Sequence, residues 1–249
     1  MPRPVVLVTG AARGSGKAIA HRFARDGYAV APTGRNAASL AAVAGDIALA
    51  GTDVLSLACD VTDRDAVTRV VAQIEQRLGP IDVLVNNAGE SASAPFASMD
   101  DELWDRMIAV NLTGTYNCMR AVVPSMFTRG RGRVINIASV AAKIGFAYTS
   151  AYVASKHGVL GLTRAVAIEA ATRGVTVNAI CPGWMNTDMT SRSIERIVEK
   201  TGKSAEDARR TLERMNPQQR LIEPEEVADI AAFLASAQAA GINGQDITI

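Results

Sequence analysis

Short apolar runs alternate with longer helical patterns along most of this chain. The first three strand-like runs cover residues 5–9, 29–33 and 54–58. The helical patterns that follow them cover residues 16–25, 37–50 and 63–78, respectively. Later strand-like runs cover residues 83–86, 133–137, 176–180 and 247–249. Strands separated by helices of this length form right-handed βαβ units, so the order predicts a parallel sheet with helices on both faces.

The composition agrees with an α/β fold. Hydrophobic residues make up 48% of the chain and aromatic residues only 4%, so the core is expected to consist of Ala, Val, Ile and Leu. No linker, low-complexity tract or repeat interrupts the pattern. We therefore expect one Rossmann-like domain over residues 1–249, with a doubly wound parallel sheet of about seven strands. Pro32 lacks a ladder donor, which predicts that the second strand ends or bulges there.

The charge balance excludes several classes of partner. With 26 basic and 25 acidic side chains, the net charge of +1 provides no field to attract nucleic acid or a membrane surface. The three cysteines show no metal-ligand spacing, so we expect reduced structural thiols and no metal site. The first strand-like run follows Met1 too closely for a signal peptide, and no apolar run is long enough to span a membrane. We expect a cytoplasmic protein with a small-molecule substrate.

A glycine-rich segment joins the first strand to the first helix. Residues 9–16 read Thr-Gly-Ala-Ala-Arg-Gly-Ser-Gly. A tight turn before a helix N-terminus lets backbone N–H groups and the helix dipole meet a pyrophosphate, although glycines also serve ordinary turns. A triphosphate-binding P-loop is disfavoured, because Ala11 replaces its first glycine and Ala18 its magnesium-binding hydroxyl.

Tyr152 and Lys156 lie four residues apart in a predicted helix over residues 150–171. This spacing places both side chains on one helix face. A neighbouring ammonium favours the phenolate and is expected to lower the tyrosine pKa from its usual value near 10. The spacing taken alone is more typical of a buried aromatic beside a solvated lysine.

The motifs and their order resemble the classical short-chain dehydrogenase/reductase family over essentially the whole chain. The matching positions are Gly10, Gly14 and Gly16, Asp60, the Asn-Asn-Ala-Gly motif at residues 86–89, Asn111, Ser139, the Tyr-Val-Ala-Ser-Lys run at residues 152–156, and Pro182, Gly183 and Thr187. In two respects the chain departs from the family pattern. Ser15 replaces a usual aliphatic residue, and the chain ends at Ile249 where relatives continue through a glycine-rich tail that contributes to subunit contacts and the pocket wall.

The resemblance implies a set of catalytic roles. Tyr152 would be the general acid for reduction and the general base for oxidation, and Ser139 would hydrogen-bond the substrate oxygen. Lys156 would hold the nicotinamide ribose and lower the pKa of Tyr152. Asn111 would bind a helix carbonyl and a water of a proton relay. Ser139 capping a turn and Asn111 capping a polar loop remain as alternatives.

The implied cofactor is a nicotinamide dinucleotide, whose hydride chemistry requires no metal. The cofactor-binding residues are expected to be Gly10, Arg13, Gly14, Ser15, Gly16, Arg35, Asp60, Val61, Asn87, Ala88, Gly89, Tyr152, Lys156, Pro182, Gly183 and Thr187. An NAD site places an acid at the end of the second strand, but here Gly34 occupies that position and Arg35 follows it. Arg35 and Arg13 from the glycine segment therefore favour the 2'-phosphate of NADP(H), unless both are solvated surface residues.

Residues 184–220 interrupt the strand–helix alternation and are charged and helical by propensity. Their position after the sixth strand predicts a substrate lid above the carboxyl ends of the sheet. The pocket walls are expected to include Ser91, Ser93, Ile144, Phe146, Tyr148, Trp184, Met185 and Met189. His157 is expected to face away from the site, because it follows Lys156 on a different helix face.

These features together predict an NADPH-dependent carbonyl reductase. The chain is most similar to reductases of 3-oxoacyl carrier proteins, of acetoacetyl-CoA and of polyketides, through residues 136–139 and 155–158. An NAD-dependent secondary alcohol dehydrogenase and a non-catalytic dinucleotide sensor are the alternatives, although a sensor would not need the full Asn, Ser, Tyr and Lys set. The resemblance also implies a homo-oligomer, a tetramer paired through helices near residues 111–127 and 150–171.

Overall fold

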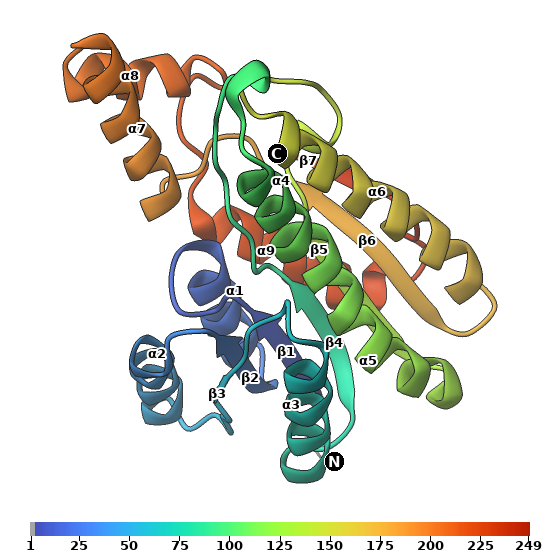
Figure 1. Cartoon of the computed structure of the whole chain (residues 1–249). Helices are drawn as coiled ribbons and strands as arrows, with labels where there is room; N and C mark the ends of the chain where they lie inside the picture. Colours follow the sequence, from blue (N-terminus) through green and yellow to red (C-terminus); the bar gives the residue numbers. More distant parts are fainter. Residues whose placement is uncertain (1–2) are drawn as a thin grey trace.

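A seven-stranded parallel sheet forms the centre of the computed structural model, which describes residues 3–249. The strand order is β3-β2-β1-β4-β5-β6-β7 (Figure 1). The strands are β1 (Val5–Thr9), β2 (Ala29–Gly34), β3 (Leu57–Ala58), β4 (Ile81–Asn86), β5 (Gly132–Ile137), β6 (Val175–Cys181) and β7 (Asp246–Thr248). The predicted fold class is confirmed. The assignment of residues 1–249 to one domain stays a prediction.

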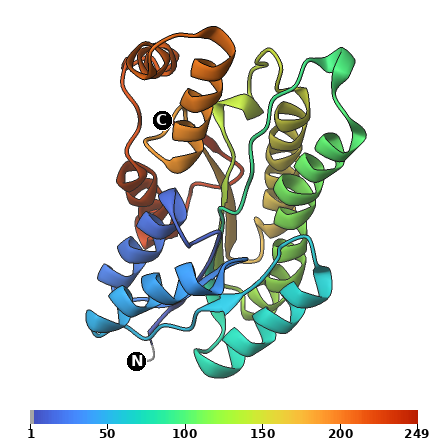
Figure 2. The ribbon, with the colours of Figure 1, turned by 60° about the vertical axis from the view of Figure 1, so that its left-hand side comes forward.

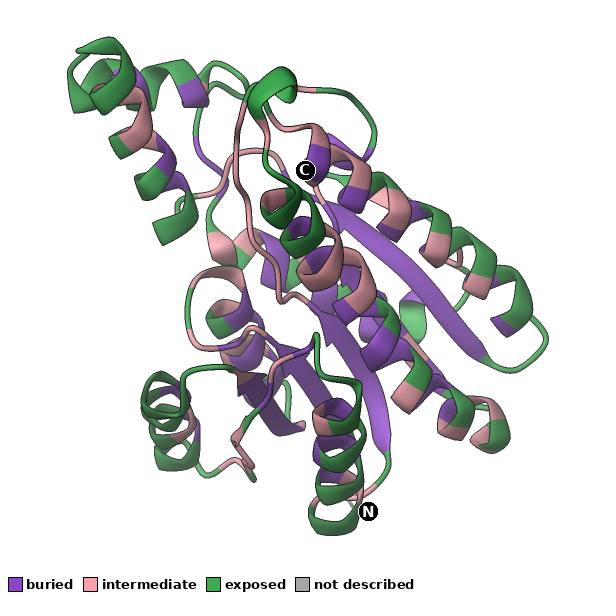
Figure 3. Ribbon diagram, in the orientation of Figure 1, coloured by how far each residue is buried: buried purple, intermediate pink, exposed green. Residues whose placement is uncertain are grey.

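Helices cover both faces of the sheet, which lies between two helical layers in Figures 1 and 2. The helices are α1 (Gly14–Arg25), α2 (Ala37–Leu49), α3 (Arg64–Arg77), α4 (Asp101–Ile108), α5 (Gly114–Arg129), α6 (Ser150–Ala170), α7 (Asp188–Thr201), α8 (Ala205–Glu213) and α9 (Pro224–Ala235). Val6 and Val8 of β1 pack into one core with α1, α2 and α9. Val5 and Leu7 point the other way, into a core with α3, α5 and α6. Successive side chains of a strand alternate between faces, so both clusters are needed to bury β1 (Figure 3).

Side-chain caps fix where several of these helices begin. Asn36 accepts a hydrogen bond from the backbone N–H of Ser39, and Asp63 accepts one from that of Ala66. Such caps satisfy backbone donors that have no partner within the helix. They explain why α2 and α3 begin close to the positions that the sequence predicts.

The prediction that β2 ends or bulges at Pro32 is wrong. β2 continues to Gly34, and Pro32 pairs in register with Val8 of β1. Val30 donates its N–H to Asp53 on the other side of the strand, and strand alternation places the nitrogen of Pro32 on that same side. There the ladder is interrupted between the Val30–Val54 bridge and β3. The missing donor therefore costs no ladder hydrogen bond. The predicted strand over residues 54–58 is correspondingly short, because only Leu57–Ala58 pairs continuously.

The strand order reverses between β1 and β4, which each continue to a different side of the sheet. In doubly wound sheets, ligands bind outside the carboxyl ends of the strands at this switch point. The glycine segment follows β1 and the Asn-Asn-Ala-Gly motif closes β4. The fold therefore brings two of the predicted cofactor motifs to the same edge.

Candidate active site

The glycine segment forms a tight turn between β1 and α1. Gly10 and Gly14 adopt positive φ values of +65° and +53°, which side chains rarely tolerate. A Cβ atom at Gly16 would overlap the carbonyl oxygen of Gly10 and the side-chain amide of Asn87. The segment is thus a closely packed turn that leads into the N-terminus of α1, where the helix dipole favours an anion. The residues present fit the pyrophosphate of a dinucleotide.

We expect Gly16→Ala to lower the free energy of unfolding by about 1–3 kcal/mol, because the added methyl group forces the backbone of Gly10 to move. Gly45 of α2 is the matched control, since a Cβ there meets no atom within 4 Å. Gly45→Ala is expected to raise the free energy of unfolding by about 0.5–1 kcal/mol, through the better helix propensity of alanine. Urea unfolding of both variants measures the contrast, and equal stabilisation of the two would contradict it.

Asn87 ties the glycine segment to the end of β4. Its side-chain amide donates to the carbonyl oxygens of Thr9 and Gly10 at 3.0 and 3.3 Å. Its oxygen accepts the hydroxyl of Ser15 at 2.8 Å. Ser15, a departure from the pattern of the resembled family, therefore links the glycine segment to the end of β4 through its hydroxyl. The hydroxyl of Thr9 accepts the backbone N–H groups of Asn87 and Ala88, a role that the sequence reasoning missed.

Ser139, Tyr152 and Lys156 meet beyond the carboxyl end of β5. Ser139 begins a short helical turn after β5 and accepts the N–H of Ala141 at 3.1 Å, and its side chain lies near enough to that of Tyr152 to lower the pKa of the tyrosine. Lys156 is buried, with Nζ 5.8 Å from the ring centre of Tyr152. The ammonium donates to the carbonyl of Ile137 at 2.9 Å, which holds it in place.

Burial dominates the proton affinities of this pair. It raises the pKa of Tyr152 above its ordinary value, and the side chain of Ser139 offsets only part of that rise. It also lowers the pKa of Lys156 to about 8, because a buried ammonium loses hydration. The pKa of Tyr152 is therefore raised by its surroundings, in contrast to the lowering expected from the sequence. Lys156 lies over the ring, and its ammonium is directed to a backbone carbonyl.

Asn111 lies in a π-helical segment (Ala109–Thr113) between α4 and α5 and is completely buried. Its side-chain oxygen accepts the N–H of Glu90 at 2.9 Å, and its amide donates to the carbonyl of Glu90 at 3.0 Å. The amide also lies 3.1 Å from the hydroxyl of Ser155 in α6. Asn111 thus links the segment after β4 to the helix that carries Tyr152. The carbonyl that Asn111 binds therefore belongs to the segment after β4 and not to a helix, and the water of the implied proton relay stays a prediction.

Gly89 lies between Asn111 and Lys156. A Cβ at Gly89 would stand 3.0 Å from Oδ1 of Asn111 and 3.5 Å from Nζ of Lys156. The end of the Asn-Asn-Ala-Gly motif is therefore adjacent to the lysine, so a ligand held by this motif would also lie near Lys156.

Asp60 and Val61 occupy the turn after β3. One carboxylate oxygen of Asp60 accepts both the N–H and the hydroxyl of Thr62, at 2.9 and 2.8 Å. Val61 is buried, and its carbonyl accepts the side-chain amide of Asn117 in α5 at 2.9 Å. These contacts fix the turn that the resemblance assigns to the adenine side.

The two arginines predicted to bind a 2'-phosphate are both largely exposed and both lie near carboxylates. Arg13 has Nη1 3.8 Å from Asp188 at the start of α7. Arg35 has Nη2 2.6 Å from Oε1 of Glu90. Glu90 follows the Asn-Asn-Ala-Gly motif directly, and no motif in the sequence marks it.

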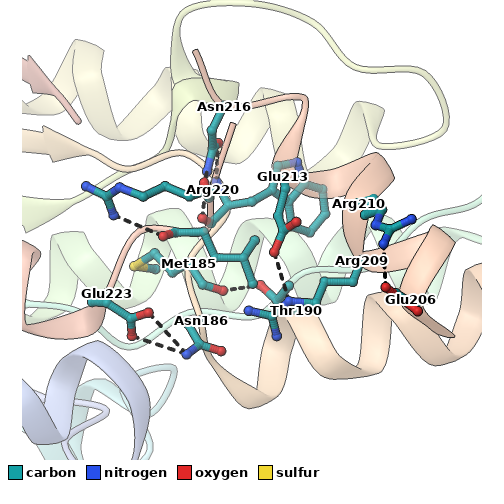
Figure 4. Close-up of polar contacts among 12 residues, drawn as sticks. Met185, Asn186, Thr190, Glu206, Arg209, Arg210, Glu213, Asn216, Arg220 and Glu223 are labelled. Carbon is teal, nitrogen blue, oxygen red and sulfur yellow. Dashed lines mark hydrogen bonds and ion pairs between the residues drawn. The ribbon is translucent and has the colours of Figure 1, made fainter. Parts of the chain in front are cut away.

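The predicted lid over residues 184–220 contains α7 and α8, which lie at the carboxyl edge of the sheet in Figure 1. Asn216 joins the two ends of this segment (Figure 4). It accepts the N–H of Trp184 at 2.9 Å and donates to the carbonyls of Trp184 and Arg220 at 2.9 and 2.7 Å. A Cβ at Gly183 would overlap Asn216, so Gly183 permits this close approach. Only an Asn-Pro turn signal in the sequence marks Asn216.

The first residues after β6 connect residues 184–220 to both sides of the candidate site. Pro182 accepts the N–H of Val140 at 3.0 Å, next to Ser139, and Gly183 donates its N–H to Ile249 at 3.0 Å. Thr187 lies against the glycine segment, since a Cβ at Gly14 would be 3.4 Å from its methyl group. Pro182, Gly183 and Thr187 therefore lie between the catalytic and the phosphate-side motifs.

The residues expected to form the pocket walls differ in exposure. Ser91, Ser93, Phe146, Trp184 and Met185 are half-buried, whereas Ile144, Tyr148 and Met189 are exposed. Met185 also packs against the core that contains α1 and α9. His157 is exposed, and its Nδ1 lies 3.0 Å from the carbonyl of Val153. It faces away from Lys156, as the helix period predicts.

The described part of the chain contains neither a group of metal ligands nor an exposed cysteine. Residues 3–249 contain no cluster of His, Cys, Asp or Glu suited to a metal ion. Cys59, Cys118 and Cys181 are free and buried, and burial raises the pKa of each thiol. None of the described helices is long and apolar enough to cross a membrane.

The chain belongs to the short chain dehydrogenase family, whose model matches residues 4–197. A 3-oxoacyl-acyl-carrier-protein reductase from Staphylococcus aureus is 36% identical, over 98% of this chain and 95% of that protein. A 3β-hydroxysteroid dehydrogenase from Mediterraneibacter gnavus is 38% identical, over 96% of this chain and 91% of that protein. A crystal structure of a variant actinorhodin polyketide ketoreductase with NADPH superposes with a TM-score of 0.96, at 37% identity, covering 100% of this chain and 97% of that one. The predicted family is confirmed, and with it the enzyme class of oxidoreductases.

Proposed function

We propose that this protein is an NADPH-dependent carbonyl reductase that converts a ketone, such as a 3-oxoacyl thioester or a related β-keto compound, into an alcohol. The convergence of Ser139, Tyr152 and Lys156 beside Gly89 carries the proposal. Relatives named as reductases of oxoacyl and polyketide substrates, one of them solved with NADPH, support it.

Each residue of the site would have a separate role in this reaction. The N–H groups of residues 10–16 and the N-terminus of α1 would hold the pyrophosphate of NADPH, which supplies the hydride when bound. Ser139 would hydrogen-bond the ketone oxygen, and Tyr152 would donate its phenolic proton to that oxygen as the alcohol forms. Lys156 would bind the nicotinamide ribose through its ammonium. Asn111 is a positioning residue, because it holds the backbone of Glu90 against Ser155 of the catalytic helix.

Burial favours the neutral phenol of Tyr152 over the phenolate, and the phenol is the form that reduction of a ketone needs. A tyrosine whose pKa is raised stays a neutral phenol at pH 7, and only the phenol can donate a proton. Oxidation would need the phenolate and is therefore expected to require higher pH. An NAD-dependent alcohol dehydrogenase working oxidatively is the main alternative, and kinetics with both cofactors in both directions distinguish the two.

We expect kcat for reduction to be constant below about pH 7 and to fall as the pH rises through about 8. Lys156 has a pKa lowered to about 8, so its ammonium is lost at a pH where an ordinary lysine would still be charged. A pH–rate profile at saturating cofactor and ketone measures the break. Lys156→Arg keeps the charge and is expected to shift the break upward while lowering the rate. A rate that rises steadily to pH 10 would contradict this role for the ammonium.

A substrate panel tests the proposed activity directly. Acetoacetyl thioesters, β-keto esters and bulky aryl ketones are compared with NADPH and with NADH, following cofactor absorbance. Turnover of the β-keto compounds with NADPH would support the proposal. Cofactor binding without turnover of any ketone or alcohol would instead support a dinucleotide sensor.

We also propose a cytoplasmic homotetramer. Tyr116 of α5 and Ile168 of α6 are 40% and 78% exposed, which leaves apolar surface on both helices that the family resemblance assigns to subunit contacts. Light scattering at micromolar concentration tests the assembly, and a stable monomer would refute it.

A further inference from the structure

Glu90 lies between two arginines at the mouth of the proposed cofactor site. Its Oε1 is 2.6 Å from Nη2 of Arg35, and its Oε2 is 3.6 Å from Nε of Arg106 in α4. The carboxylate is 27% exposed, against 63% for Arg35 and 54% for Arg106. Glu90 is therefore the most buried of the three charged side chains in this cluster.

The Arg35–Glu90 contact crosses the sheet at the switch point. Arg35 follows β2 and Glu90 follows β4, and β1 lies between these two strands. A Cβ at Gly34 would stand 3.9 Å from Cα of Gly10, so the end of β2 lies against the glycine segment. The ion pair thus passes over the carboxyl end of β1, next to the turn that would hold the cofactor's pyrophosphate.

The two partners are held very differently. Asn111 binds both the N–H and the carbonyl of Glu90, so the backbone that carries this carboxylate is fixed to a buried side chain. The guanidinium of Arg35 stands at the end of a long, largely exposed side chain. An exposed arginine can change its partner at little cost, whereas the carboxylate of Glu90 can move only within the reach of a backbone that is held in place.

We propose that Glu90 is a specificity-determining residue for the cofactor, a fixed anion that competes with a 2'-phosphate for the guanidinium of Arg35. This inference rests on the proposed NADPH preference. A 2'-phosphate recruits Arg35 and leaves Glu90 paired with Arg106, whereas a cofactor with a free 2'-hydroxyl leaves the Arg35–Glu90 pair intact. Glu90 therefore weakens the binding of the phosphorylated cofactor and moderates the discrimination that Arg35 provides.

The test removes the charge and keeps the shape. Glu90→Gln is expected to lower the Kd for NADP⁺ by about 2- to 5-fold, the range that partly exposed ion pairs contribute, and to leave the Kd for NAD⁺ within about 1.5-fold. Isothermal titration with NADP⁺, NAD⁺ and adenosine 2',5'-bisphosphate measures the binding without turnover. Added salt should reduce the gain, because it screens exposed charges. Glu169→Gln in the last turn of α6 is the matched control for net charge, and it should alter neither Kd.

A double-mutant cycle shows whether Glu90 acts through Arg35. In an Arg35→Ala background, Glu90→Gln is expected to leave the NADP⁺ Kd unchanged. An equal gain for NADP⁺ and NAD⁺, or a gain that persists without Arg35, would overturn the inference. Thermal melting of each variant without ligand identifies any loss of folding.

The proposed cofactor preference and the proposed role of Glu90 can be refuted independently of each other. A wild type that binds NAD⁺ at least as tightly as NADP⁺ contradicts the proposed cofactor preference, whereas a wild type that prefers NADP⁺ while Glu90→Gln changes nothing contradicts the role of Glu90 alone.

Discussion

Replacing Tyr152 with phenylalanine is expected to lower kcat for ketone reduction by about 10²- to 10⁴-fold, the range typical of lost general acid catalysis. The substitution removes only the hydroxyl, which lies near Ser139 and whose burial-raised pKa keeps it protonated at pH 7. The ring is unchanged, so Lys156 keeps its position and its hydrogen bond to the carbonyl of Ile137. Steady-state kinetics at saturating NADPH, with a ketone that the wild type turns over, measure the loss.

The Kd for NADPH is expected to stay nearly constant in the same variant, because the phenolic hydroxyl adds little to cofactor binding. Tyr116→Phe on α5 is the control, since it removes an identical hydroxyl from a partly exposed ring outside the proposed site. It should leave kcat unchanged. A Tyr152→Phe enzyme that retains more than half of the wild-type kcat would exclude Tyr152 as the proton donor.

Much of the fold is predictable because burial imposes periodicity on the sequence. Val5 to Val8 are apolar at successive positions, a pattern that fits a strand covered on both faces. The structure divides these four side chains between two cores. The third strand was less predictable. At the edge of the sheet, pairing depends on the one neighbouring strand, and only Leu57–Ala58 pairs continuously with β2.

The site was predictable in its motifs and less so in its contacts. The four-residue spacing of Tyr152 and Lys156 placed both on one helix face, but no local pattern shows that burial is the main influence on the tyrosine pKa. The partners of Asn111 were also missed. Glu90 and Ser155 lie 21 and 44 residues away in sequence, and only the packing of α6 against the π-helical segment brings them together.

Cofactor choice is expected to rest on Arg35. A 2'-phosphate carries close to two negative charges near neutral pH, so a bidentate arginine contact to it is charge-assisted and contributes roughly 1.5 to 3 kcal/mol. Arg35→Ala should therefore raise the KM for NADPH by about 10- to 150-fold. NADH has no phosphate at this position, so its kinetics should barely change. The fold should tolerate the loss, because Arg35 is largely exposed and Glu90 retains Arg106 nearby.

Adding Gly34→Asp to Arg35→Ala is expected to reverse the preference to NADH. The three atoms nearest to a Cβ at Gly34 belong to Leu40 and Gly10 and lie at 3.8 to 3.9 Å, so the added Cβ makes ordinary contacts. Its carboxylate would accept hydrogen bonds from the ribose hydroxyls and repel a 2'-phosphate. The measurement is kcat/KM for both cofactors on the wild type, Arg35→Ala and the double variant at fixed ionic strength. If the wild type already prefers NADH, or if Arg35→Ala lowers kcat/KM equally for both cofactors, then Arg35 is a surface residue, and the choice of cofactor must arise elsewhere in the site.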